Sequence, residues 1–278
     1  SDTLLVLGGT GYGRFCVETG RLTEAEPWLM RAGARAPVTI RDVHVAALKA
    51  LMGWLVDKRK LKENPVSGVK IRVPKAKKLR SKALTDAEAK IILQATLAEQ
   101  PPQLGARHAM ARRWVPWLAA YTGARVNELT QIRREDVFQD GEIAVVRITP
   151  EAGSVKTSSA RVVPLHEHLV AQGFMDFVKA QRPGPLFYEP GSGKSVATPP
   201  YKKLGERLAS WVRSVGVDDP LVDPNHGWRH KFKTVGRRAG MAPGALDAIQ
   251  GHATRTESEG YGEYEVVTLA AEIAKIPR

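Results

Sequence analysis

Residues 225–232 read NHGWRHKF, and the rest of the chain is interpreted outward from this stretch. His226 and Arg229 are three positions apart at a predicted helix start, so both side chains project from one face. A second histidine, His252, follows Gly251 in the run AIQGHATRTESEGYGEY, and Tyr261 lies nine residues beyond it. A histidine and arginine pair, another histidine and a tyrosine therefore follow one another near the end of the chain.

A further arginine stands upstream, in the run YTGARVNEL over residues 121–129. Arg125 follows a glycine that breaks a predicted helix, and Glu128 lies one turn further along the next helix. Taken alone, this pair is typical of a surface ion pair. The ordered set of Arg, His-x-x-Arg, Gly-His and Tyr, however, resembles the tyrosine recombinase or phage integrase family over about residues 84–265.

The resemblance implies an enzyme that cuts and rejoins DNA through a 3′-phosphotyrosine at Tyr261. Two guanidiniums, Arg125 and Arg229, suit the charge that builds on the phosphate oxygens, because they donate in a planar fork and stay charged. His226 is expected to accept or shuttle the tyrosine proton, and His252 to hydrogen-bond the phosphate. No carboxylate cluster suits magnesium, so we expect no metal, and the resemblance implies that strands are rejoined without ATP or another cofactor.

The family also supplies an acid for the leaving 5′-oxygen, a lysine from a β-hairpin loop. Lys156 is the only lysine between Lys90 and Lys179, and it lies in such a predicted loop; an ordinary solvated lysine is the alternative. Glu128 is expected to orient Arg125 and to transfer no proton. Tyr264, three residues past Tyr261, is a competing nucleophile.

Three neighbours of this set carry weaker expectations. His230 is expected to point off the face of Arg229, as a structural residue or a contact to the DNA backbone. Trp228 and Gly227 occupy positions where the family usually has Leu and Asp, which leaves the local packing open.

Net charge favours a polyanionic partner, since the 278 residues carry a formal charge of +13. Residues 1–82 hold 17 Lys and Arg against 7 Asp and Glu. The run KIRVPKAKKLRSK over residues 70–82 has seven cations and no acid. It is interpreted as a linker that tracks the DNA backbone, with a merely solubilising connector as the alternative; the predicted contacts are Lys70, Arg72, Lys75, Lys77, Lys78, Arg80 and Lys82.

Other classes of protein fit the composition poorly. The single cysteine, Cys16, excludes an intramolecular disulfide and suits a reducing cytosol. No apolar run approaches the roughly 20 residues that span a bilayer, so we expect no membrane partner. Leu4–Gly13, LLVLGGTGYG, looks like the start of a dinucleotide-binding fold, but the strands and helices that should follow it are missing.

Hydrophobic periodicity predicts a mainly α chain with a small antiparallel β-sheet. We expect a helical core-binding domain over residues 1–72, a basic linker over 73–82, and a mixed α/β catalytic domain over 83–278. Thr39 is expected to cap an amphipathic helix over 39–58, and Thr85 with Glu88 to form a capping box. The predicted apolar face of the helix over 39–58 consists of Val43, Ala46, Ala47, Ala50, Leu51, Trp54 and Leu55. Strands are predicted at 142–148 and 161–165, and helices at 112–121, 126–132, 166–180, 200–215, 228–239, 243–250 and 266–276.

The resemblance further implies a homotetramer on two double-stranded recombination sites, with the C-terminal helix docking onto a neighbour and accessory proteins bending the DNA. Such a protein would act on the nucleoid, in the cytoplasm of a bacterium or a phage-infected host. Two alternatives remain open at this point. One is a type IB topoisomerase-like nicking and closing enzyme, and the other is a catalytically silent DNA-binding regulator.

Overall fold

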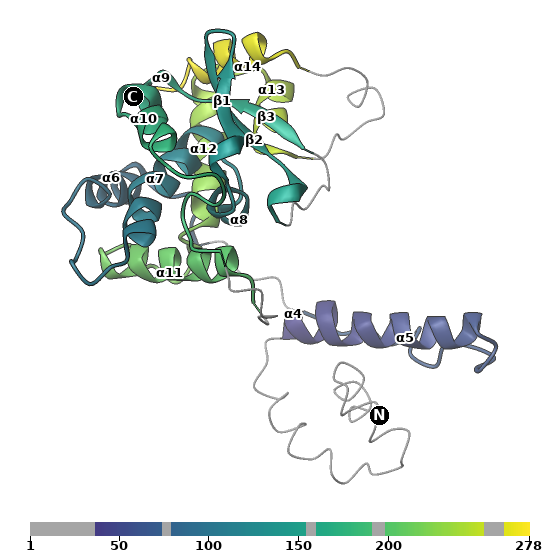
Figure 1. Ribbon diagram of the computed structural model, residues 1–278. Coiled ribbons are helices and arrows are strands. Elements are labelled where there is room, and N and C mark those ends of the chain that lie inside the picture. The colour runs from purple at the N-terminus through teal and green to yellow at the C-terminus, as the bar shows by residue number, and fades with distance from the viewer. Residues whose placement is uncertain (1–36, 74–78, 154–159, 191–197, 253–263) are drawn as a thin grey trace. The chain divides into compact units, whose positions relative to one another are not determined.

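The computed structural model describes residues 37–73, 79–153, 160–190, 198–252 and 264–278 (Figure 1). The chain divides into two compact units after Lys78, which lies inside the predicted linker. The boundaries expected for the domains, and the DNA-binding role expected for the first, stay predictions. No helix in the described ranges is long and apolar enough to cross a membrane.

The first unit contains the predicted helix, although its buried face differs from the expected one. The helix runs through α4 (Pro37–Thr39), a π-helical turn η2 (Ile40–Val45) and α5 (Ala46–Asp57). Thr39 has helical backbone angles and makes no capping hydrogen bond, so the predicted cap is wrong. Val45 and Leu48 are buried whereas Trp54 is exposed, because a π-turn adds a residue and rotates the positions that follow it.

The second unit begins with helices whose ends follow the predicted signals. The capping box of Thr85 and Glu88 is confirmed: each donates its backbone N–H to the other's side chain at the start of α6 (Asp86–Ala95). α7 (Ala106–Thr122) ends at Gly123, whose φ of +58° lies in the left-handed region. α8 (Val126–Thr130) then starts directly after Arg125.

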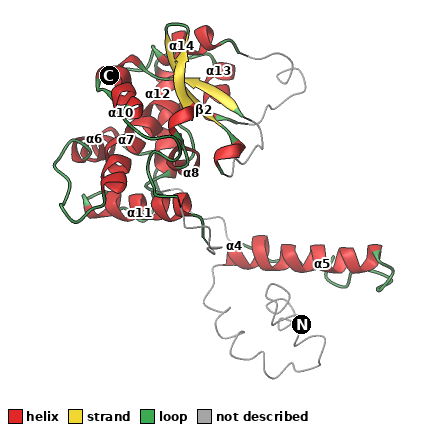
Figure 2. Cartoon of the chain, viewed as in Figure 1, coloured by secondary structure: helices red, strands yellow, loops and turns green. Residues whose placement is uncertain are grey.

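A three-stranded antiparallel sheet follows, in the order β1, β2, β3 (Figure 2). The predicted strands are β2 (Ile143–Ile148) and β3 (Arg161–Pro164), with Ile148 opposite Arg161. β1 (Val137–Asp140) was not expected, because its four residues end in two polar side chains and offer too little alternation. Two 3₁₀ turns, η3 (Arg134–Asp136) and η4 (Pro150–Ala152), flank β1 and β2.

The remaining helices lie close to the predicted ranges. The predicted helix over 166–180 is split in two at Gly173, which has a φ of +85°. α13 and α14 pack against β3, and Figure 1 shows them beside the sheet. The helices are α9 (Glu167–Ala171), α10 (Phe174–Lys179), α11 (Pro200–Ser214), α12 (His226–Arg238), α13 (Pro243–Gln250) and α14 (Val266–Ile273).

The core of the second unit is one hydrophobic cluster that takes buried side chains from all its α-helices and from its three strands. Trp114, Trp117 and Trp211 are buried, as their helical spacing predicts. Gly227 packs closely against Leu84, because a Cβ at position 227 would lie only 2.9 Å from Leu84 Cγ. A larger residue would not fit there without a shift. The departure from the family's usual residue therefore fits the local packing.

Candidate active site

Arg229 lies at the centre of the candidate site, in the first turn of α12. It is almost fully buried, with 4% of its surface exposed. Its Nη1 donates to the carbonyl oxygens of Gly123 at 2.8 Å and Gln250 at 2.6 Å, and Gln250 Nε2 donates back to the Arg229 carbonyl. Arg229 thereby joins the turn before Arg125 to the end of the helix before His252.

This guanidinium donates to carbonyl oxygens and to no carboxylate of the described residues, although the charges of Glu128 and Asp247 act on it from further away. Burial lowers the pKa of Arg229 to about 10, and the positive charges of Arg125 and Arg161 act in the same direction. The group still carries its charge at neutral pH. Its Nη2 is buried and has no hydrogen-bond partner within the described part of the chain. A buried cation with a free donor is stabilised by an anion such as a phosphate oxygen.

Arg125 is held by Glu128, one turn further along. Arg125 Nη1 donates to Glu128 Oε1 at 2.8 Å, and the Arg125 backbone N–H donates to Oε2 at 3.1 Å. The Glu128 side chain is 1% exposed and that of Arg125 is 25% exposed. This is a buried carboxylate that orients a partly exposed guanidinium, rather than a surface ion pair.

Arg161, at the start of β3, is a residue of the site that the sequence did not reveal. Its Nη2 donates to Glu128 Oε2 at 2.6 Å. Burial alone would raise the pKa of the Glu128 carboxyl, but Arg161 and then Arg125 outweigh it and lower that pKa. The strand pattern could have pointed to it. Residues 161 and 163 point to the same face of the strand, and Val163 is buried, so an apolar side chain would be expected at position 161.

His226 opens α12, and its backbone N–H donates to Asp223 Oδ1 at 2.8 Å. Partial burial of the ring lowers the pKa of His226, and the neighbouring charges of His230 and Arg229 add to this effect. The ring is therefore mostly neutral at pH 7 and able to accept a proton. The expected orientation of His230 is wrong, since its ring meets that of His226 edge-on at 4.9 Å; a spacing of four residues returns to the same helical face.

His252 follows α13 and is fixed by Asp247, another residue that was not predicted. His252 Nδ1 lies 2.9 Å from Asp247 Oδ1, which also pairs with Lys233. Burial would raise the pKa of Asp247, but its bonds to Lys233 and His252 lower it. A carboxylate only accepts, so Nδ1 carries the proton and Nε2 is left for a ligand. Burial lowers the pKa of His252 itself.

The two remaining catalytic candidates, Lys156 and Tyr261, lie outside the described residues. Tyr264 is described and is 47% exposed. Its hydroxyl packs so closely on Gly244 that a Cβ there would clash with it. Gly244 is in the first turn of α13, whereas His252 follows the last turn, so the Tyr264 hydroxyl lies at the opposite end of that helix.

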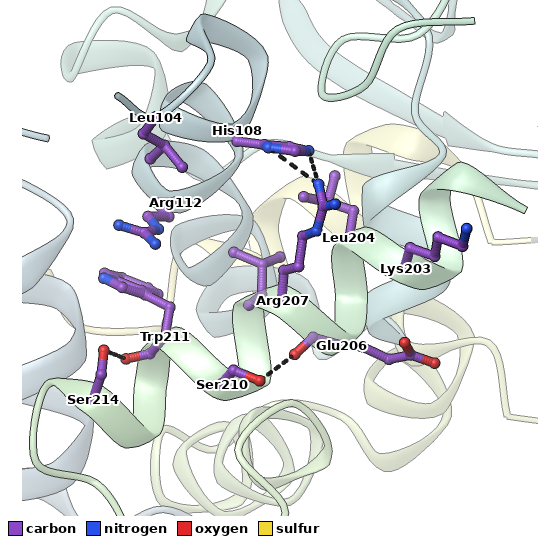
Figure 3. Close-up of a pocket in the computed structure, with 11 residues that line it drawn as sticks. Leu104, His108, Arg112, Lys203, Leu204, Glu206, Arg207, Ser210, Trp211 and Ser214 are labelled. Carbon is purple, nitrogen blue, oxygen red and sulfur yellow. Dashed lines mark hydrogen bonds between the residues drawn. The ribbon is translucent and has the colours of Figure 1, made fainter. Parts of the chain in front are cut away.

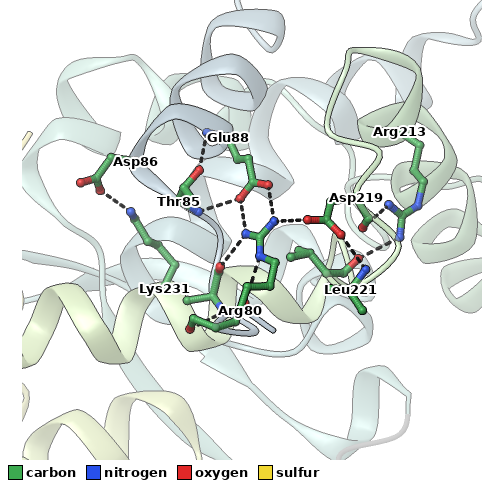
Figure 4. Close-up of polar contacts among 11 residues, drawn as sticks. Arg80, Thr85, Asp86, Glu88, Arg213, Asp219, Leu221 and Lys231 are labelled. Carbon is green, nitrogen blue, oxygen red and sulfur yellow. Dashed lines mark hydrogen bonds and ion pairs between the residues drawn. The ribbon is translucent and has the colours of Figure 1, made fainter. Parts of the chain in front are cut away.

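The predicted DNA-contacting linker residues have different surroundings. Lys75, Lys77 and Lys78 lie outside the described residues, and Lys70, Arg72 and Lys82 are exposed. Arg80 donates to Glu88 at 2.9 Å and to Asp219 at 2.6 Å, as Figure 4 shows. Its charge is therefore already compensated by two carboxylates.

A surface pocket of about 640 Å³ lies between α7 and α11 and contains none of the predicted site residues (Figure 3). Arg207 donates to His108 at 3.0 Å, and the Arg112 guanidinium lies 5.5 Å from the centre of the Trp211 ring. The described ranges contain no group of three His, Cys, Asp or Glu side chains placed to hold a metal ion. Because this pocket contains none of the predicted site residues and the described ranges offer no metal site, the candidate active site is the cluster around Arg229.

Comparison with known proteins gives one curated relative by sequence. No protein-family model matches the chain. Tyrosine recombinase XerD from Halalkalibacterium halodurans is 26% identical over 239 residues, which cover 84% of this chain and 73% of that protein.

Solved structures show the same fold. The Tn1549 transposon integrase, in complex with transposon right end DNA, matches with a TM-score of 0.54 and 20% identity over 91% of this chain and 84% of that one. The integrase from mycobacterium phage Brujita matches with 0.51 and 21% identity, over 90% and 76%. XerH bound to its difH substrate matches with 0.52 and 18% identity, over 89% and 68%.

Proposed function

We propose that this chain, which is similar to tyrosine recombinase XerD and has the fold of the Brujita and Tn1549 integrases, is a site-specific DNA recombinase that cuts and rejoins strands through a covalent 3′-phosphotyrosine at Tyr261. The convergence of Arg125, His226, Arg229 and His252 carries the proposal. The charge of Arg229 acts on both histidines, and that of Arg125 acts on His226 and on Arg229. Such a concentration of cationic and proton-transferring groups suits one phosphodiester.

The cleavage step follows from these residue types. The Tyr261 hydroxyl oxygen attacks phosphorus, and the bond from phosphorus to the 5′-oxygen breaks. His226, neutral at pH 7, accepts the phenol proton. Lys156 gives a proton to the departing 5′-oxygen. Arg125 and Arg229 bind the non-bridging oxygens and stabilise the charge that builds on them in the transition state.

Rejoining is the reverse reaction with a new partner. The 5′-hydroxyl of another strand attacks the phosphotyrosine, and the phenol leaves with a proton returned by His226. The phosphotyrosine bond retains the free energy of the broken phosphodiester, so ligation needs no ATP. The guanidiniums supply the electrostatic stabilisation that metal ions supply in many other phosphoryl transfers, so the proposed reaction needs no metal.

The proposed partner is a double-stranded recombination site, since the XerH and Tn1549 integrase structures contain bound DNA. We also expect a homotetramer with contacts through α14. In this helix Leu269 and Ile273 are buried within the unit, whereas Val267 is 61% exposed and offers an apolar contact to a neighbour. Accessory DNA-bending proteins stay an expectation from the family.

A nicked suicide substrate tests the proposal. Loss of the small fragment next to the nick traps the covalent protein–DNA adduct, which denaturing gels detect. Tyr261→Phe removes only the hydroxyl, so we expect normal DNA affinity and no adduct. Tyr264→Phe is the matched control and should form the adduct, because its hydroxyl lies at the far end of α13 from His252. The reverse pattern would refute the assignment of Tyr261.

A further inference from the structure

We propose that Arg161 is a positioning residue that locks the segments carrying Arg125, Arg229 and His252 into one geometry. The rate of strand cleavage would then depend on Arg161 through its contacts with Glu128 and with the end of α13. The inference rests on the proposed function. It concerns a residue outside the set of Arg, His-x-x-Arg, Gly-His and Tyr by which the site is recognised.

The first contact of Arg161 is with the carboxylate that orients Arg125. Glu128 Oε2 accepts from Arg161 Nη2 at 2.6 Å, and Oε1 accepts from Arg125 Nη1 at 2.8 Å. The Arg161 side chain is 13% exposed and that of Glu128 is 1% exposed. A carboxylate this deeply buried needs compensation, and Arg161 supplies it while Arg125 keeps donors for a ligand.

The second contact is with the end of α13. Arg161 Nε donates to the Ile249 carbonyl at 3.2 Å, and Nη2 to the Gln250 carbonyl at 3.4 Å. A cation suits these last carbonyls of a helix, which carry partial negative charge. The Gln250 carbonyl also accepts from Arg229 at 2.6 Å, so one oxygen connects Arg161 to the central arginine of the site.

Gly251 shows how closely the guanidinium is packed. Gly251 has a φ of +65°, and a Cβ on it would lie 2.5 Å from Arg161 Cζ. The glycine ends α13 and leaves room for Arg161, and His252 comes next in the chain. Arg161 thereby fixes the direction in which His252 leaves the helix.

The chemistry of the side chain explains why an arginine is required. Three acceptors on two separate segments are reached from one planar group, and an ammonium on a flexible stem does not match that geometry. Arg161 also begins the strand that follows the segment carrying Lys156, and it pairs with Ile148 across the sheet. The same side chain thus ties the sheet to both helix ends.

Kinetics of the full chain on the nicked substrate test the proposal. We expect Arg161→Met to lower the single-turnover rate of adduct formation at saturating DNA by about 10- to 100-fold, the range found when groups that orient active-site ligands are removed. The dissociation constant for DNA should change little. Arg161→Lys should recover only part of the rate. Arg147→Met is the matched control: Arg147 is exposed on the neighbouring strand, with its guanidinium over Phe138, and we expect it to keep the wild-type rate.

A pH profile separates positioning from general stabilisation. Without Arg161, buried Glu128 faces only Arg125 and, more distantly, Arg229, so its pKa should rise. As the pH falls toward this raised pKa, Glu128 should take up a proton, and the Arg161→Met rate should fall more steeply than the wild-type rate. Adding Glu128→Gln should remove that excess slope, because glutamine does not titrate.

The outcomes are distinct. An Arg161→Met variant with the rate and pH profile of Arg147→Met would overturn the inference alone. A variant that merely melts at lower temperature, with an unchanged rate below its melting point, would also overturn it. If the wild-type chain itself forms no adduct, the proposed function fails, and the inference fails with it.

Discussion

Two of the arginine and carboxylate networks in the second unit differ in charge balance. At Arg80 one guanidinium meets two carboxylates, Glu88 and Asp219. At Glu128 the ratio is reversed, because one carboxylate meets two guanidiniums. In the first network the carboxylates fully compensate the positive charge of Arg80. In the second network the single carboxylate leaves an excess of positive charge, which suits an anionic ligand.

The pKa values follow the same division. Hydrogen bonds to Glu88 and Asp219 raise the pKa of Arg80, and the bond to Arg80 lowers the pKa of Glu88 to about 2. Beside the Glu128 network, burial and then the charge of Arg125 lower the pKa of Arg229 to about 10. Charge balance therefore distinguishes an ion pair that holds the fold from a cluster suited to an anion, even where the residue types are the same.

The largest expected effect is on the rate of adduct formation, which should depend on Arg229 and not on Arg80. Arg229→Lys should lower the rate of adduct formation by about 10²- to 10³-fold, the usual result of removing one preorganised donor to a developing oxyanion, because an ammonium lacks the planar fork. Arg80→Lys should leave the rate near that of the wild type. Equal losses in single-turnover assays of the two variants would remove the distinction between the networks.

A smaller effect is expected where a carboxylate supports the cationic cluster. Asp247→Asn should slow adduct formation by about 10- to 100-fold, because His252 loses the charged acceptor that fixes its Nδ1 proton. Asp219→Asn, in the other network, is the matched control and should change the melting temperature more than the rate. A rate loss that is the same for both would mean that Asp247 acts on folding only.

DNA binding should distinguish the linker lysines Lys75, Lys77 and Lys78 from Arg80. Replacing Lys75, Lys77 and Lys78 by Ala should reduce the slope of log affinity against log salt by about 0.9 for each duplex phosphate that the variant no longer neutralises. Arg80→Met should leave that slope unchanged, because two carboxylates already compensate its charge. Titrations of specific and scrambled duplexes over a salt series give both slopes. An unchanged slope in the triple variant would favour the solubilising connector.

The smallest expected effect is on the melting temperature of the chain at acid pH. The pKa of Glu88 is lower in the folded chain than its ordinary value of 4.5, so its stabilisation is full above pH 4.5 and is lost as the pH falls toward 2. Glu88→Gln should therefore lower the melting temperature at pH 7 and flatten its dependence on pH between 4.5 and 2. Thermal melts over that range check this, and parallel curves for wild type and variant would contradict it.

Sequence predicted the parts of the fold that local chemistry determines. The capping box at Thr85 and the helix end at Gly123 depend on neighbours within four residues, and both appear in the structure. β1 and the buried face of α5 were missed, because a short strand depends on its partner and a π-turn on tertiary packing.

The candidate site shows the same limit. Arg125, His226, Arg229 and His252 were recognisable because their order and spacing are a pattern in one dimension. Arg161 meets Glu128 across 33 positions and Gln250 across 89. Strand alternation places Arg161 on the same face as Val163, but it does not identify partners so distant in the sequence.

Gly123 and Gly251 have a consequence for protein engineering. Both end a helix with left-handed backbone, and each precedes an arginine or histidine of the site by one or two residues. A side chain at Gly123 would collide with Phe232 and Gln250, and one at Gly251 with Arg161. A mutant library built to retarget the enzyme to new DNA should keep both codons constant. Most variants with a substitution at either glycine would lose activity, whichever DNA bases they prefer. Gly141 also has a positive φ, of +59°, but open space around it, so asparagine is an acceptable codon choice at that position.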